Sequence, residues 1–382
     1  MMPPSSRRCV LMTADAVGGV WVFATTLATA LTGNGYRVHL VVLGPEPTRE
    51  QLEPLRGNAS IEIEVTDLAL EWLDPEGKDL DRALERLAAI ERRVRPDLVH
   101  LNSFREANGA WTVPVLLTAH SCVWSWWRAC RGGIPSEPRW RIYRSHVASG
   151  LAAATAWVAP TEASRDEIQA IYAPPGAGAV IWNGIEAIVP GEKEPVILAA
   201  GRLWDEAKNI AALADAAQHL DWPVRLAGAV RSEDGNNGEF ETSRLQMLGE
   251  LSRTGLVAQM QRAAIFAAPT RYEPFGLAVL EAAAAGCALL LSDIATLREL
   301  WSGAAWFADP NDRAAIRAGL ERLCRDDALR RALQQAACDR ARRYSLKITA
   351  EAYRKAYEAI GTVRSTGQRP AQDTRAHAEA SA

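Results

Sequence analysis

The sequence predicts an α/β protein made of two doubly wound domains, each built on a parallel sheet. Short apolar stretches alternate with longer segments of helical period, which is the pattern of parallel sheets covered by helices. The alternation stops at a polar, proline-flanked stretch, residues 188–195, and then begins again. The length of 382 residues agrees with two domains, because one domain takes roughly 150 residues.

The first half of the chain contains short aliphatic runs that indicate buried parallel strands. Parallel neighbours need long crossover connections, so helices are expected between most of these strands. A right-handed doubly wound sheet is the natural assembly. The expected strands span residues 9–13, 37–42, 61–65, 98–101, 113–118, 157–159 and 180–182.

The second half repeats the pattern with its own strands and helices. Two such domains, joined by a short linker, are expected to bind a ligand in a cleft at the carboxyl ends of their strands. The strands are expected at 196–200, 224–227, 246–248, 265–267, 288–292 and 305–307, and the helices near 209–220, 256–263, 277–285, 312–324 and 327–342.

The end of the chain departs from this alternation. Residues 346–360 carry apolar side chains at helical spacing, so a last helix is expected to pack on the body of the protein. Large apolar residues are absent from Arg364 onward, which predicts a disordered tail. The predicted boundaries are 1–187 and 188–345 for the two domains, 346–361 for the helix and 362–382 for the tail.

The composition excludes several classes of protein. Forty-three Lys+Arg against 46 Asp+Glu give a formal charge of -3, which offers no field that would recruit nucleic acid. Apolar runs end before the ~20 residues of a membrane span, and residues 1–10 lack the apolar core of a signal peptide, so a cytoplasmic protein is expected. The six cysteines show no CxxC spacing, which predicts reduced thiols and no structural metal.

Two strand ends carry residues suited to anion binding. Gly18 and Gly19 follow the first strand and precede a helix, where a ligand can approach the backbone and the helix N-terminus; a tight turn without a ligand fits equally well. Arg202 and Lys208 follow the first strand of the second half. Two cations at that sheet edge can hold a diphosphate, although two surface cations paired with neighbouring carboxylates are the plainer interpretation.

The most informative segment is residues 269–286. Glu273 lies in the loop after a buried strand, and Glu281 sits about one turn inside the helix that begins at Leu277. The free N–H groups at the helix start suit phosphate, whereas each carboxylate can accept hydrogen bonds from sugar hydroxyls. Glu281 is unlike an ordinary exposed residue, because the rest of its helix is apolar and an unpaired buried carboxylate would cost several kcal/mol.

These motifs occur in the order seen in retaining GT-B glycosyltransferases, and the chain resembles glycosyltransferase family four over residues 8–361. The resemblance implies the GT-B fold, in which an N-terminal acceptor-side domain and a C-terminal nucleotide-sugar domain face a central cleft. The last helix then packs back on the body. The residues that carry the resemblance are Gly18-Gly19, His120, Asn183-Gly184-Ile185-Glu186, Gly201-Arg202 with Lys208-Asn209, and Glu273-Pro274-Phe275-Gly276-Leu277 with Glu281.

The resemblance also implies a role for each of these residues. Glu273 would bind hydroxyls of the donor sugar, and Glu281 the ribose. Arg202 and Lys208 would grip the diphosphate and neutralise the leaving group. His120 would lie against the donor sugar from the other domain, although a histidine at a strand end also fits a core position. The remaining donor contacts are Gly18 and Gly19, which would face the phosphates and the acceptor, and the backbone of Phe275, Gly276 and Leu277. Glu186 departs from the family pattern, because an aspartate is commoner after Asn-Gly-Ile in these enzymes. The departure concerns only the region between the domains and not the donor site.

The expected activity is retaining transfer of a hexosyl group from an NDP-sugar, UDP-glucose or a close relative. The acceptor would be a hydroxyl of a carbohydrate, a lipid-linked or a small molecule. No cofactor and no metal ion are expected, because Arg202 and Lys208 can neutralise the charge that builds on the departing diphosphate and no Asp-x-Asp triplet for a metal–diphosphate bridge is expected anywhere in the chain. The alternatives are a sugar-nucleotide epimerase or hydrolase of the same fold, and a binding scaffold without turnover. An NAD-dependent oxidoreductase lacks its GxGxxG motif.

Residues 122–144 concentrate tryptophan and arginine directly after His120. The segment holds four of the 13 tryptophans and a net charge of +4 in a chain whose total is -3. Indole faces can cover a sugar ring and arginines can bind hydroxyls or phosphate, which predicts an acceptor-side surface. Helix packing with solvated arginines, and weak contact with the inner membrane face, are the alternatives. The acceptor-side candidates are Trp126, Trp127, Arg128 and Arg131.

Overall fold

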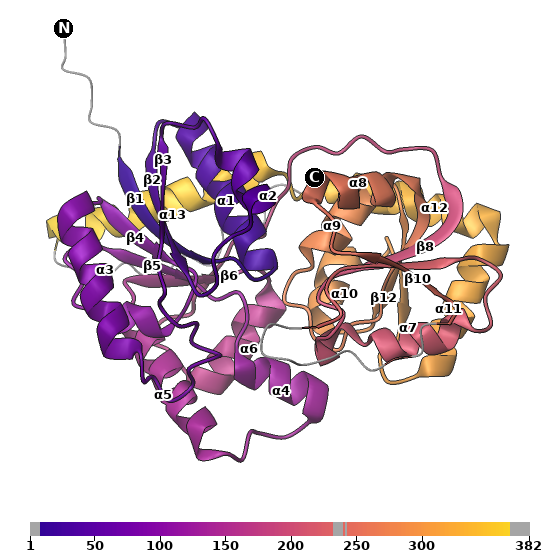
Figure 1. Cartoon of the computed structure of the whole chain (residues 1–382), viewed down its shortest axis with the longest axis horizontal. Helices are drawn as coiled ribbons and strands as arrows, with labels where there is room; N and C mark the ends of the chain where they lie inside the picture. The colour runs from indigo at the N-terminus through magenta and orange to yellow at the C-terminus, as the bar shows by residue number, and fades with distance from the viewer. Residues whose placement is uncertain (1–7, 232–239, 241–242, 367–382) are drawn as a thin grey trace, which may run out of the picture. The chain divides into compact units, whose positions relative to one another are not determined.

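The computed structural model describes residues 8–231, 240 and 243–366. Contacts between Cα atoms divide the chain into two compact units. The first unit comprises Met1–Ser125, Ile134–Trp182 and Lys347–Ala382, and the second comprises Trp126–Gly133 and Asn183–Leu346. Each contains its own parallel sheet with helices on it (Figure 1), which confirms the predicted α/β class with two doubly wound sheets.

Within its described residues, the first unit forms a seven-stranded parallel sheet in the order β3-β2-β1-β4-β5-β6-β7. The order reverses between β1 and β4, so the loops after these two strands diverge and leave room for a ligand at their carboxyl ends. The strands are β1 (Cys9–Asp15), β2 (Arg37–Leu43), β3 (Ile61–Val65), β4 (Leu98–Leu101), β5 (Val115–Thr118), β6 (Ala156–Ala159) and β7 (Ala179–Val180).

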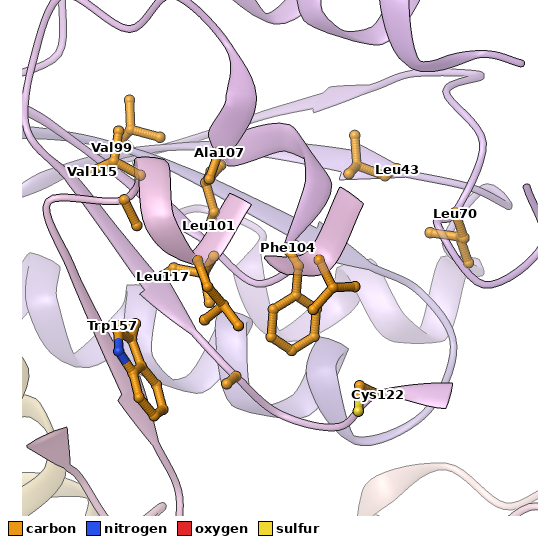
Figure 2. Close-up of a cluster of buried hydrophobic side chains, with 14 of the residues drawn as sticks. Leu43, Leu70, Val99, Leu101, Phe104, Ala107, Val115, Leu117, Cys122 and Trp157 are labelled. Atoms are coloured by element: carbon orange, nitrogen blue, oxygen red, sulfur yellow. The ribbon is translucent and has the colours of Figure 1, made fainter. Parts of the chain in front are cut away.

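The helices of the first unit cover this sheet and close its core. Figure 2 shows Phe104 and Trp157 among leucine and valine side chains of the central strands, and both aromatic residues are almost fully buried. Burial of such apolar surface is the main driving force for forming the unit. The helices are α1 (Gly19–Gly33), α2 (Arg49–Leu52), α3 (Leu80–Val94), α5 (Pro138–Ala153), α6 (Glu162–Tyr172) and α13 (Leu346–Thr366). Helix α4 (Val123–Arg131) begins in this unit, but its residues from Trp126 onward group with the second unit.

The last helix, α13, returns to the first unit (Figure 1). Tyr357 shares a hydrogen bond of 2.7 Å with Nδ1 of His100, whose Nε2 lies 2.7 Å from Oγ1 of Thr118. The hydroxyl of Tyr353 lies 3.2 Å from the same threonine oxygen. All four side chains are buried, so a polar network inside the fold fixes the helix against strands β4 and β5.

The second unit contains, in its described part, a six-stranded parallel sheet ordered β10-β9-β8-β11-β12-β13. Leucine and isoleucine side chains from these strands form a core with helices α7 and α11. The strands are β8 (Glu194–Ala200), β9 (Val224–Ala227), β10 (Leu245–Gly249), β11 (Ala263–Ala268), β12 (Ala288–Ser292) and β13 (Trp306–Ala308). The helices are α7 (Ile210–Ala217), α8 (Arg253–Arg262), α9 (Leu277–Ala284), α10 (Ala295–Trp301), α11 (Arg313–Arg325) and α12 (Asp327–Ala341).

Three elements differ from the sequence-based expectation. The strand expected at 180–182 is the two-residue β7, which lies at 179–180, and the carbonyl of Trp182 accepts a hydrogen bond from Thr349 of α13. Helix α10 was not predicted; it is short and its first turn has no side-chain cap. The tail expected from residue 362 is wrong for its first five residues, because α13 continues to Thr366. The rest of that tail, 367–382, lies outside the described residues.

Candidate active site

The carboxyl end of strand β8 opens into a loop that carries two of the predicted cations. We call residues 201–209 the cation loop. Gly201 and Gly228, after the neighbouring strands β8 and β9, have φ of +143° and +138°. A Cβ atom on Gly228 would lie 1.8 Å from the carbonyl oxygen of Gly201, so the close approach of these two loops requires a glycine there.

Asn209 anchors the far end of the cation loop. It adopts a left-handed conformation with φ of 54°, which ends the short 3₁₀ turn Glu206–Lys208 and begins α7. Its buried side-chain amide donates to the carbonyls of Pro269 (2.9 Å) and Pro310 (2.8 Å). The backbone N–H of Arg271 also donates to the carbonyl of Ala207 at 2.7 Å. These bonds hold the cation loop against the segment that carries Glu273.

Both cations of the loop lie beside carboxylates. Lys208 Nζ is 2.7 Å from Glu273 Oε2, and the two side chains are 19% and 17% exposed. Arg202 donates from Nη2 to Asp205 Oδ2 at 2.8 Å. Charge pairing in a partly buried place is stronger than at the surface, because fewer water molecules screen it. The structure therefore brings Lys208 against Glu273 and puts Arg202 in the same loop as Lys208, while their roles toward a diphosphate and a sugar stay predictions.

Helix α9 supplies the second predicted carboxylate. It begins after Gly276, whose φ of +87° favours glycine, and Phe275 is buried with its ring edge against Tyr344. Glu281 is 5% exposed, and its Oε1 accepts a hydrogen bond of 3.1 Å from Arg253 Nε at the start of α8. Burial raises the pKa of Glu281 above its ordinary value, while Arg253 acts in the opposite direction. Arg253 is a site residue that the sequence analysis missed.

In the first unit, strand β1 leads into the predicted glycine turn. Gly18 has φ of +83°, and a Cβ atom on Gly19 would meet no described atom within 4 Å. The carboxylate of Asp15 accepts the backbone N–H of Val17 at 2.8 Å, which shapes the turn. The start of α1 after this turn has no side-chain cap, so its backbone is accessible to an anion.

His120 follows strand β5 and is held by a second residue that the sequence analysis missed. Its Nε2 lies 2.7 Å from Oδ1 of Asn102, whose amide group donates to the carbonyl of Thr13 at 2.6 Å. Because Oδ1 can only accept, Nε2 carries the proton and Nδ1 is left as an acceptor. Phe23 packs edge-on against the imidazole at 4.6 Å. Desolvation lowers the pKa of His120 to about 3, so the ring is neutral at physiological pH.

The tryptophan- and arginine-rich segment is divided between the two units. Trp124 is buried in the core of the first unit, where its indole N–H donates to the carbonyl of Trp140 at 3.0 Å. Residues Trp126–Gly133 group with the second unit instead. There Trp126 donates to Asp205 and Arg131 pairs with Glu206. Arg128 is exposed. The acceptor role of this segment, Trp127 included, stays a prediction.

The sequence does contain an Asp-x-Asp triplet, Asp79-Leu80-Asp81, in the first unit. Asp79 immediately precedes α3, accepts the N–H of Ala69 at 2.8 Å and is paired with Arg82. Asp81 is exposed on that helix. The triplet belongs to the fold of the first unit and is not part of the cation loop. In the ranges that the structure covers, no three His, Cys, Asp or Glu side chains gather as a metal site would require.

Two Rossmann-like sheets, with paired cations and carboxylates at the carboxyl edge of one of them, define a GT-B glycosyltransferase, an enzyme that transfers glycosyl groups. Solved structures share this fold over 92% of the chain. The alignment with sucrose-phosphate synthase from Thermosynechococcus elongatus covers 98% of that chain, with a TM-score of 0.76 and 18% sequence identity. The alignment with HepE from Anabaena in complex with UDP-glucose covers 99% of that chain, with a TM-score of 0.71 and 16% sequence identity.

The chain belongs to glycosyltransferase family 4. The model of Glycosyltransferase Family 4 matches residues 17–187, and the model of Glycosyl transferases group 1 matches residues 181–340. Glycogen synthase from Mycobacterium tuberculosis is 27% identical over 324 residues, which is 74% of this chain and 76% of the relative. Phosphatidyl-myo-inositol mannosyltransferase from Mycobacterium leprae is 32% identical over 121 residues, 31% and 32% of the two chains. None of the described helices has the length and apolar character to cross a membrane.

Proposed function

We propose that this protein is a retaining glycosyltransferase that moves a hexosyl group from an NDP-sugar, UDP-glucose or a close relative, to a hydroxyl acceptor. The observation that carries the proposal is the cation loop, in which Arg202 and Lys208 lie at one sheet edge and Lys208 contacts Glu273. A family 4 enzyme needs cations where the diphosphate leaves and a carboxylate where the sugar binds, and the cation loop supplies the cations while Glu273 beside it supplies the carboxylate.

The leaving group determines what the cations must do. As the glycosidic bond to the diphosphate breaks, negative charge builds on the phosphate oxygens and the sugar becomes oxocarbenium-like. The diphosphate then replaces Glu273 as the strongest anionic partner of Lys208. Arg202 keeps Asp205 on one side of its guanidinium and offers the rest to phosphate. Both cations act most strongly in the transition state, because the charge is largest there.

Release of Lys208 leaves the carboxylate of Glu273 with hydrogen-bonding capacity to spare. A carboxylate accepts hydrogen bonds readily, so Glu273 would bind hydroxyls of the donor sugar rather than attack its anomeric carbon. Retention then follows from attack of the acceptor on the same face that the diphosphate leaves, with a phosphate oxygen taking the acceptor proton. The backbone of Phe275, Gly276 and Leu277 borders the sugar and phosphates in this proposal.

The nucleoside would lie further along α9. Glu281 is buried and already oriented by Arg253, so its second oxygen is set to accept ribose hydroxyls. HepE was solved with UDP-glucose, which supports a uridine nucleotide as the first donor to test. The first unit would add neutral groups, namely the Nδ1 acceptor of His120 and the backbone at Gly18 and Gly19.

A thermal-shift panel of UDP, GDP, ADP and their glucose or mannose derivatives tests the proposal. A ligand that binds only the folded state raises the Tm by mass action, so UDP and UDP-glucose should give the largest shifts. Lys208→Met should reduce those shifts, whereas Lys355→Met, at an exposed lysine of α13, should leave them unchanged. Absence of a shift with every nucleotide, or equal shifts in wild type and Lys208→Met, would contradict the donor assignment.

A further inference from the structure

Asp205 is a buried carboxylate inside the cation loop, and donors from three places converge on it. Its Oδ2 accepts from Arg202 Nη2 at 2.8 Å. Its Oδ1 accepts from the backbone N–H of Ala207 at 2.9 Å and from the indole Nε1–H of Trp126 at 3.0 Å. The residue is only 6% exposed. A desolvated carboxylate depends on such donors, so each of them helps to set its orientation.

The indole that completes this set comes from helix α4, far from the cation loop in the sequence. Arg131, one and a half turns further along α4, stacks over the rings of Trp126 and Trp127 at 5.1 and 4.6 Å. The same guanidinium donates from Nε to Glu206 at 3.2 Å, the residue next to Asp205. Two neighbouring carboxylates of the loop are therefore both bound by α4, and the indole of Trp126 is held from its ring face.

Arg202 shows why the orientation of Asp205 matters. Its side chain is 41% exposed, and Asp205 is its ion-pair partner. Its Nε is buried and makes no hydrogen bond to any described residue. A buried donor without a partner is costly, and a phosphate oxygen would satisfy it. The Asp205 carboxylate thus holds one edge of the guanidinium and leaves Nε for a ligand.

We propose that Trp126 is a positioning residue for the donor diphosphate: through Asp205 it fixes the guanidinium of Arg202 in the orientation that a phosphate oxygen requires. The inference rests on the proposed function, because it assigns Arg202 to the diphosphate. It differs from the acceptor-side role that the sequence predicted for Trp126. Helix α4 then supports donor binding with an indole N–H that itself need not touch the donor.

Trp126→Phe tests this by removing the N–H while keeping an aromatic ring for Arg131. We expect kcat/KM for the sugar nucleotide and the affinity for the free nucleoside diphosphate to fall about tenfold, with the acceptor KM unchanged. Trp124→Phe is the matched control. It lies on the same helix and loses an indole bond to a backbone carbonyl, so it measures a merely structural loss and should change kcat/KM less than twofold.

A double-mutant cycle with Arg202→Gln separates positioning from packing. In that background Trp126→Phe should have no further effect on kcat/KM, because no guanidinium remains to be oriented. Equal effects in both backgrounds, or a change confined to the acceptor KM, would overturn the inference. If Arg202→Gln alone turns over like wild type, the proposed function is at fault instead.

Arg131→Gln provides a second measurement that does not alter either tryptophan. Loss of the stacking and of the Glu206 bond should loosen the indole and lower donor affinity in the same direction as Trp126→Phe, by a smaller factor. Thermal melts identify any variant that fails to fold. If Trp126→Phe does not fold, the donor affinity of Arg131→Gln tests the inference in its place. Wild-type donor affinity in folded Arg131→Gln would then count against the inference.

Discussion

In the second unit the candidate side chains of the cation loop and α9 are charged and paired, whereas the first unit offers two glycines and a neutral histidine. Lys208 and Glu273 form an ion pair there, with Nζ 2.7 Å from Oε2. His120 is neutral because desolvation opposes its protonation. The contrast teaches that the candidate site of the second unit is built from paired charges, whereas that of the first is built from backbone and a neutral side chain.

The largest expected effect comes from removing the cations of the second unit. Lys208→Ala and Arg202→Ala should each lower kcat by about 10²-fold or more, equivalent to roughly 2.7 kcal/mol of lost transition-state stabilisation. Steady-state assays with saturating sugar nucleotide measure it, and Lys355→Ala serves as the control. Near-wild-type turnover in either site variant would remove that cation from the mechanism.

The neutral histidines of the first unit can be tested by lowering the pH. Desolvation lowers the pKa of both His100 and His120 to about 3, so between pH 6.5 and 3 only the unfolded state takes up their protons. Stability therefore falls as the pH falls through this window, by about 2 kcal/mol for each histidine between pH 7 and pH 5. Hydrogen exchange of amides in β4 and β5 reports on it for the first unit.

A matched variant assigns this acid sensitivity to its source. His120→Gln removes one of the histidines whose pKa is lowered, His100 and His146 being the others, so the loss of protection between pH 7 and pH 5 should become smaller. An unchanged pH dependence in His120→Gln would show that other groups cause it.

The two candidate-site carboxylates of the second unit, Glu273 and Glu281, can be compared with each other. Glu281→Ala should weaken binding of any nucleoside diphosphate about tenfold, because the ribose hydroxyls lose an acceptor that is buried and oriented. Glu273→Ala should leave that affinity intact and harm only the steps that depend on the sugar. Calorimetry with the free diphosphate distinguishes them, and equal losses would mean that the carboxylates do not divide the donor.

The smallest expected effect is that of removing metal ions. If Arg202 and Lys208 neutralise the leaving group, EDTA should leave turnover within about twofold of the untreated enzyme. Turnover that EDTA abolishes and Mg²⁺ or Mn²⁺ restores would require a metal site, and Asp79→Asn would then ask whether the Asp-x-Asp triplet supplies it.

Local patterns predicted much of the fold and of the charged site. Aliphatic runs located most strands to within a residue or two, since buried parallel strands have few polar positions. The apolar surroundings of Glu281 in its own helix predicted that it would be buried, as it is. Arg253 and Asn102 were missed because their partners, Glu281 and His120, are 28 and 18 residues away in sequence and on other elements. A polar residue directly after strand β4 is the signal that could have found Asn102.

The segment after His120 marks where sequence reasoning fails for a physical reason. Its composition predicted a surface for sugar or phosphate, yet composition cannot say which neighbour an indole N–H will meet. In the sequence, Asp205 is simply one of the carboxylates that neighbour Arg202 and Lys208, whereas its burial and its bond to Trp126 depend on the fold around it. Long-range pairing of this kind is set by packing, which one sequence does not reveal.

Helix α13 has a consequence for biosynthesis. The side chains that cover His100 and Thr118 come from much later in the sequence, because Tyr357 and Tyr353 follow these residues by 257 and 235 positions. All of the second unit's main segment, Asn183–Leu346, is translated before them. The first unit is therefore begun early and finished last, whereas the second can complete its sheet in between. A nascent chain arrested or cleaved before α13 would carry a second unit with a complete sheet and an unfinished first unit, with buried polar groups of β4 and β5 open to water.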